Sequence, residues 1–188
     1  AATYPAGSTI FFRGGDTFSG SLAFTASSWP ISSTNPITIG SYGTGRATIN
    51  SGAAIGASFL NISGFELQDL NFIGNGTTDV NGVYLYNNQT GTGKLSYVRL
   101  TDLDVTGYGR SGVMILGGYG PTGDTTDTAG FNDVLLTGIA AHGNTSFSTD
   151  FSAGIRVVGR HGFYGPRTAP THTNGSIVGC HAYHNLGN

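Results

Sequence analysis

The stretch Phe65-Glu66-Leu67-Gln68-Asp69-Leu70-Asn71-Phe72 recurs, loosely, three times further along the chain. The later copies are VRLTDLDV at 98–105, VLLTGIAA at 134–141 and SIVGCHA at 176–182. Three apolar columns share one register at intervals of 33, 36 and 41 residues: Leu70, Leu103, Ile139 and Cys180; Leu67, Leu100, Leu136 and Ile177; Phe72, Val105, Ala141 and Ala182. Such a shared register indicates a repeat in which each unit packs on the next.

The repeat also contains a bend and a second strand. The same intervals align Asn75, Tyr108, Asn144 and Asn185 just after the first strand, and stacked asparagines at one bend suggest a ladder of side-chain amides. Alternating apolar strands follow the bends at 82–85, 112–115 and 154–157. Antiparallel meanders rarely repeat strand and bend together, whereas a solenoid does so by construction. The pattern therefore predicts an all-β fold, a parallel β-helix of about five rungs over residues 1–188.

Two segments near the start of the chain carry a family resemblance. PAGSTIFFRGGDTF at 5–18 and NPITIGSYG at 35–43 resemble the first rungs of bacterial right-handed parallel β-helix proteins of the pectate-lyase-like superfamily. The resemblance implies a right-handed coil and extends over essentially the whole chain. It specifies activity poorly, because that superfamily includes lyases, hydrolases, epimerases and proteins without activity.

The resemblance also raises an expectation about the ends. Members usually carry a capping segment before these motifs and further rungs after the last repeat. We therefore expect a partial domain without caps. We expect it either to associate with itself end to end or to bind a missing complementary segment that covers the exposed strand edges.

Composition narrows the class of protein. Charged residues make up 10% of the chain, glycine supplies 32 positions, and Lys94 is the single lysine among eight basic residues. The absence of a basic stripe argues against nucleic-acid binding, and no apolar run reaches the roughly 18 residues of a membrane span. The polar, lysine-poor balance favours a secreted or cell-surface protein. Five glycosylation sequons are expected by chance in this composition: Asn61, Asn75, Asn88, Asn144 and Asn174.

Two long insertions between rungs are candidate binding loops. They span 117–132 and 159–175, and because they leave equivalent strands one rung apart we expect them to lie side by side. Together they combine aromatic rings, carboxylates and cationic groups, which suits sugar recognition. The alternative is that these are solvated loop residues. The predicted substrate-binding residues are Tyr119, Asp124, Asp127, Tyr164 and His172, and the two aspartates could also form a hydrolase pair.

Arginines in the last third are the candidate catalytic residues. Arg156 is expected to face outward on its strand, in column with Met114 and Tyr84. In lyases of the resembled fold an arginine or lysine removes the proton α to a uronate carboxylate, which calcium neutralises. The resemblance thus makes Arg156, Arg160 and Arg167 candidate bases. His161 completes the predicted catalytic set because histidines and arginines concentrate in this part of the chain. The alternatives are that the arginines clamp substrate, or that Arg156 pairs with Asp150 on the surface.

Stacked carboxylates form the candidate metal site. Asp69 and Asp102 fall in one column, and Asp104 lies two residues on with Asn71 beneath it. Clustered oxygen ligands of this kind favour Ca²⁺. The alternative is that both aspartates bond backbone amides at a strand bend. A surface ion pair between Glu66 and Arg99 is also expected.

These features lead to two hypotheses of function. The first is a carbohydrate-active enzyme, a lyase or hydrolase acting on an acidic extracellular polysaccharide. The second is a non-catalytic β-helix that binds glycans, adheres or forms fibres. A calcium-dependent rise in unsaturated uronate products would favour the first.

Overall fold

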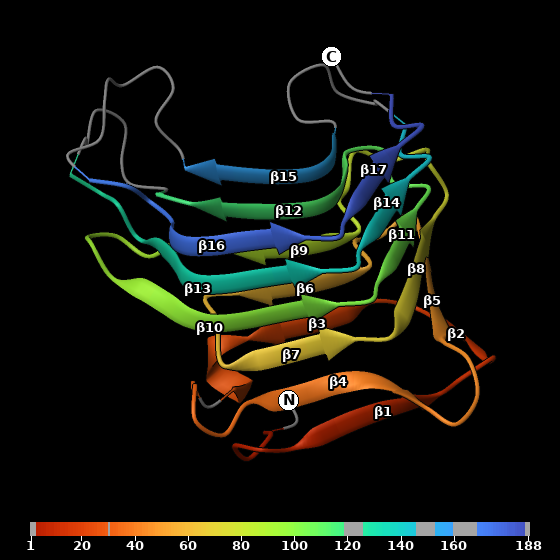
Figure 1. Cartoon of the computed structure of the whole chain (residues 1–188), viewed down its shortest axis with the longest axis horizontal. Coiled ribbons are helices and arrows are strands. Elements are labelled where there is room, and N and C mark those ends of the chain that lie inside the picture. The colour runs from red at the N-terminus through yellow and green to blue at the C-terminus, as the bar shows by residue number, and fades with distance from the viewer. Residues whose placement is uncertain (1–2, 30, 119–125, 146–152, 160–168, 187–188) are drawn as a thin grey trace.

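The computed structural model describes residues 3–29, 31–118, 126–145, 153–159 and 169–186. Figure 1 shows the chain advancing from β1 at the bottom to β15 and β17 at the top as a right-handed coil. Each complete turn contributes one strand to each of three sheets, and all pairings between neighbouring strands are parallel. The predicted parallel β-helix is confirmed.

The three sheets run side by side along the coil. The first sheet contains β1 (Thr9–Arg13), β4 (Ile37–Tyr42), β7 (Phe65–Gln68), β10 (Lys94–Thr101), β13 (Gly130–Thr137) and β16 (Thr173–Val178). The second contains β2 (Thr17–Ser19), β5 (Ala47–Gly52), β8 (Leu70–Gly74), β11 (Asp104–Thr106), β14 (Ala140–His142) and β17 (His181–Tyr183). The third contains β3 (Leu22–Thr25), β6 (Ala57–Leu60), β9 (Val83–Tyr86), β12 (Ser111–Gly117) and β15 (Ala153–Gly159). A short 3₁₀ turn, η1 (Ala26–Ser28), follows β3.

Each sheet contributes at least one continuous apolar column to the interior, because alternate side chains of every strand point inward. The first column is Ile10, Ile39, Leu67, Leu100, Leu136 and Ile177. The second is Phe18, Ile49, Phe72, Val105, Ala141 and Ala182. The third is Phe24, Phe59, Leu85, Ile115 and Val157. These are the inner columns. They include two columns predicted from the repeat, and their middle members are buried.

The predicted asparagine ladder forms only in part. The Asn144 Nδ2 donates to Asn185 Oδ1 at 2.8 Å, and Asn144 Oδ1 accepts the backbone N–H of Tyr108 at 3.0 Å. The side chain of Asn75 instead accepts from the backbone and hydroxyl of Thr77. Tyr108 breaks the amide series because its ring turns into the core.

No helix among the described residues has the length and hydropathy that a membrane crossing requires.

Candidate functional site

The outer face of the third sheet brings the predicted column of Tyr84, Met114 and Arg156 together. Met114 pairs in register with both of the other residues, across β9, β12 and β15. All three side chains point outward because their neighbours in sequence point into the core. Met114 is nevertheless only 3% exposed, so little of its side chain reaches solvent.

Two adjoining hollows lie on this face, and together they are called the tyrosine groove. The first encloses about 300 Å³ and the second about 180 Å³. The rings of Tyr84 and Tyr86 line both, and they stack on each other at 5.6 Å between centroids and 18° between planes. The remaining lining residues are Asn81, Arg110, Met114, Leu116 and Val158 in the first hollow, and Ile55, Ser58, Phe59 and Leu60 in the second.

Cationic groups lie at the first hollow. Arg110 lines it and is fixed by a bidentate ion pair, with its Nε 2.9 Å and its Nη2 2.8 Å from the two carboxylate oxygens of Asp79. Arg156 is half-buried beside Met114 and makes interactions of its own. The ion pair holds the Arg110 guanidinium in one orientation, with its Nε–Nη2 edge already taken by Asp79.

The two long loops leave neighbouring strands, as predicted. Gly117 at the end of β12 pairs with Gly159 at the end of β15. Their returning ends are tied together by Lys94, whose Nζ donates to the carbonyls of Thr128, Pro170 and Thr171 at 2.7–3.0 Å. Burial lowers the pKa of Lys94. Six predicted site residues of these loops lie outside the described residues: Tyr119, Asp124, Arg160, His161, Tyr164 and Arg167.

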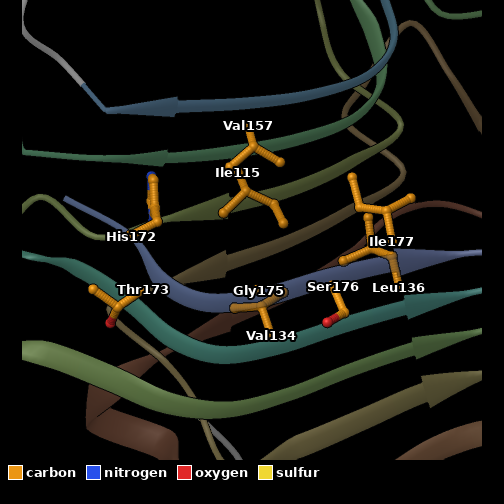
Figure 2. Close-up of a pocket in the computed structure, with 9 residues that line it drawn as sticks. All are labelled: Ile115, Val134, Leu136, Val157, His172, Thr173, Gly175, Ser176 and Ile177. Carbon is orange, nitrogen blue, oxygen red and sulfur yellow. The ribbon is translucent and has the colours of Figure 1, made fainter. Parts of the chain in front are cut away.

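His172 has a structural position at the base of the second loop. Its Nδ1 accepts the backbone N–H of Phe131 at 3.2 Å, so Nε2 carries the proton and donates to the carbonyl of Val158 at 2.9 Å. The ring also stacks on that of Phe131. Burial lowers the pKa of His172 below its usual 6.5, so the ring is neutral at pH 7. Both ring nitrogens are therefore occupied within the protein. Figure 2 shows His172 among the residues that line a hollow between β15 and β16.

Asp127 is fully buried. One carboxylate oxygen accepts the backbone N–H of Ala129 at 3.1 Å, and the other has no hydrogen-bond partner among the described residues. The carboxylate is therefore turned away from solvent, whereas the prediction placed it at a substrate surface.

The predicted metal residues lie at one corner of the coil. Asp69 and Asp102 occupy the bends between the first and second sheets, with φ of 53° and 52°. Asp104 pairs with Asn71, as expected, and its carboxylate lies 3.1 Å from Nε2 of His142. Within the described ranges, no three His, Cys, Asp or Glu side chains are placed to hold a metal ion. The calcium site stays a prediction.

The expected Glu66–Arg99 ion pair is replaced by a small network. The two residues are neighbours in register, but Arg99 forms its ion pair with Asp133 at 2.8 Å and lies over the ring of Tyr97. Glu66 instead accepts the hydroxyl of Tyr97 at 2.7 Å, which raises the pKa of that hydroxyl. A left-handed bend at Tyr97, which alternation does not reveal, brings its ring to this face.

The sequence pattern did not identify Tyr86 and Arg110 as site residues, although both line the first hollow. The alternation of Val83 and Leu85 inward also places Tyr86 on the outer face beside Tyr84, so this signal was present. Arg110 lies in the bend before β12, where no periodic pattern indicates its direction.

Comparisons of the chain with protein-family models, with curated proteins and with solved structures find no match.

Proposed function

We propose that this β-helix binds an acidic polysaccharide along the tyrosine groove. The observation that supports the proposal best is the stacked pair Tyr84–Tyr86, set in an apolar hollow beside Arg110. Sugar rings present apolar faces that pack on aromatic rings, while a guanidinium hydrogen-bonds a uronate carboxylate. The groove combines both kinds of contact.

The direction of the groove suits a chain-like ligand. Its lining residues come from β6, β9, β12 and β15, so it runs along the axis of the coil and crosses successive strands spaced about 4.8 Å apart. Each of these strands presents outward side chains to the groove. A polymer of repeated sugar units would use each rung in turn.

Binding accounts for the described charges better than hydrolysis does. A hydrolase needs two carboxyl groups facing the scissile bond. Asp79 is the acidic group described near the tyrosine groove, and Arg110 already pairs with both of its oxygens. Asp127 of the predicted hydrolase pair is buried.

Lyase activity is the second candidate, because Arg156 shares a column with Tyr84 and Met114. The resemblance to the pectate-lyase-like superfamily adds support, since an arginine base acts on uronates there. Such a base would take the proton α to the carboxylate, which requires a lowered guanidinium pKa. Calcium would neutralise that carboxylate when bound, and the described residues include no group of three His, Cys, Asp or Glu side chains placed to hold it.

Affinity measurements on polygalacturonate, alginate and a neutral glucan test the binding proposal. We expect both acidic polymers to bind more tightly than the glucan, because Arg110 and Arg156 together outweigh the negative charge of Asp79 among the described residues of this face. Tyr84→Ala and Tyr86→Ala should each weaken binding about fivefold, corresponding to about 1 kcal/mol of lost ring stacking.

Tyr42→Ala is the matched control, since Tyr42 is 53% exposed on β4 of the first sheet, away from the groove. Equal losses in Tyr42→Ala and Tyr84→Ala would overturn the placement of the site. Release of unsaturated uronates by the wild type, abolished in Arg156→Gln, would establish the lyase. Retained binding without product would leave a binding protein.

A further inference from the structure

Asn81 is a buried polar residue in the first hollow of the tyrosine groove. It lies in the bend that precedes β9 and is one of the residues that line the hollow. Only 3% of the residue is exposed, although asparagine is exposed in most proteins. Its amide carries an acceptor oxygen and a nitrogen with two N–H donors, and buried groups of this kind need partners. The partners that Asn81 has, and the one that it lacks, therefore indicate what the hollow receives.

The side-chain oxygen of Asn81 already has its partner. Oδ1 accepts the backbone N–H of Ser111, at 3.1 Å, from the neighbouring turn of the coil. Because a backbone N–H only donates, the oxygen of the amide must face Ser111 and the nitrogen Nδ2 must point the other way. The main chain is held as well, since the Asn81 carbonyl accepts the N–H of Gly56 at 3.3 Å and the N–H of Gly82 donates to the Ser111 carbonyl at 2.9 Å. The direction of the amide is thus fixed before any ligand binds.

The amide nitrogen of Asn81 has no acceptor among the described residues. It is not enclosed by the protein either, because it is not one of the sealed polar atoms that lack a partner. Leu116 and Val158, which line the same hollow, have apolar side chains, and the sulfur of Met114 is only a weak acceptor. Nδ2 is therefore an oriented donor on the wall of a largely apolar hollow, and its acceptor has to come from outside the described chain.

We propose that Nδ2 of Asn81 donates a hydrogen bond to a carboxylate oxygen of the bound sugar chain, which makes Asn81 a specificity-determining residue of the groove. This role rests on the proposed binding of an acidic polysaccharide at the same site. An ionised carboxylate only accepts hydrogen bonds, so it matches a wall that offers a donor. A hydrogen bond to a charged group is also stronger than one between neutral groups, and the apolar surroundings strengthen it further. A carboxylate therefore gains more from Asn81 than a sugar hydroxyl does.

This role separates two tasks within the groove. The rings of Tyr84 and Tyr86 pack on the faces of sugar rings, whether or not the sugar is charged. Arg110 contributes positive charge, but the ion pair with Asp79 takes its Nε–Nη2 edge. Asn81 instead contacts the acidic substituent directly. Loss of a ring should therefore weaken the binding of every polymer, whereas a change at Asn81 should weaken the binding of acidic polymers alone.

Asn81→Asp tests the donor, with affinities for polygalacturonate and a neutral glucan measured by calorimetry at pH 7. The new carboxylate keeps an oxygen for the N–H of Ser111, but it replaces the donor with a group that repels a ligand carboxylate. We expect the affinity for polygalacturonate to fall about tenfold and that for the glucan to change less than about twofold. Asn50→Asp is the matched control, because Asn50 lies on β5 of the second sheet and its Oδ1 accepts the N–H of Gly52 at 3.2 Å. It adds the same charge and keeps the same kind of bond away from the groove, so both affinities should stay near those of the wild type.

The outcomes separate this role from the proposed function. Equal affinities of Asn81→Asp and Asn50→Asp for polygalacturonate, with binding still weakened in Tyr84→Ala, would overturn the role of Asn81 and leave the groove as the binding site. A wild type that binds polygalacturonate and the glucan equally would overturn the proposed function and this role together. Circular dichroism checks that the variants are folded, and Asn81→Gln replaces Asn81→Asp if the aspartate lowers the folded fraction. Because glutamine keeps an uncharged amide but displaces its nitrogen by one methylene, the preference for polygalacturonate should fall about threefold, and an unchanged preference would contradict the proposal.

Discussion

At the scale of single residues, Tyr108 is the side chain that best reports on the core. Its ring is fully buried and its hydroxyl lies 3.0 Å from that of Ser51, two turns below. Burial raises the pKa of Tyr108 to about 12 from the usual 10.0. The neutral phenol is thus favoured in the folded state. Its stabilisation is complete below about pH 10 and is lost as the pH rises towards 12.

The effect of Tyr108→Phe on the free energy of unfolding should therefore change sign with pH. Near neutrality the variant should be about 1 kcal/mol less stable than the wild type, because Ser51 loses its hydroxyl partner. Near pH 11 the wild type should lose roughly 1.4 kcal/mol relative to the variant, since its unfolded state ionises first. Urea unfolding of both proteins across this pH range measures the difference in free energy of unfolding. The ionisation of the other tyrosines contributes equally to both proteins and cancels in this difference. A difference that does not vary with pH would contradict the burial of a neutral phenol.

The position of Tyr108 also marks what the sequence could not predict. Alternation correctly assigned inward and outward side chains on the strands, because one buried face imposes a period of two. It could not predict that the Tyr108 ring replaces an amide of the ladder. That ring fits because Gly56, Gly74 and Gly82, on three separate segments, leave the space that a Cβ would occupy.

At the scale of elements, the corner between the first and second sheets is a column of left-handed residues. Asp69, Asp102, Gly138 and Gly179 all have φ between 52° and 64°, one above another. The repeat predicted the column, and the alternative reading of Asp69 and Asp102 as bend residues agrees with these angles. Sequence alone could not choose between bend and ligand, because the two roles use the same residue type.

Two glycines of this column give a matched pair of substitutions. Gly179→Ala should lower the free energy of unfolding by about 1 kcal/mol. The cost comes from the left-handed backbone alone, since the added Cβ would meet no neighbouring atom. Gly138→Ala should lower the free energy of unfolding by about 1 kcal/mol more, because its Cβ would clash with Oδ1 of Asp102. Chemical denaturation measures both values. In an Asp102→Gly background the two costs should converge, and a persistent gap would show that the carboxylate is not the obstacle.

At the scale of the whole molecule, the coil separates stability from recognition. The inner columns hold successive turns together, whereas the tyrosine groove is lined mainly by outward side chains of the third sheet and shares Phe59 with those columns. The repeat therefore predicted the fold well and the groove poorly, because Tyr86 and Arg110 line one hollow from a strand and a bend of different turns. Changes at Tyr84 and Tyr86 should leave the coil intact.

A coil of this kind should lose structure from its ends, since each turn contacts only its neighbours. Strand β16 is exposed along residues 174–178 and β17 throughout, whereas the inner side chains of β7 and β10 are buried on both sides. In dilute solution, hydrogen exchange followed by mass spectrometry should show the fastest strand exchange in β16 and β17 and the slowest in β7 and β10. Uniform exchange along the coil would contradict unfolding from the ends.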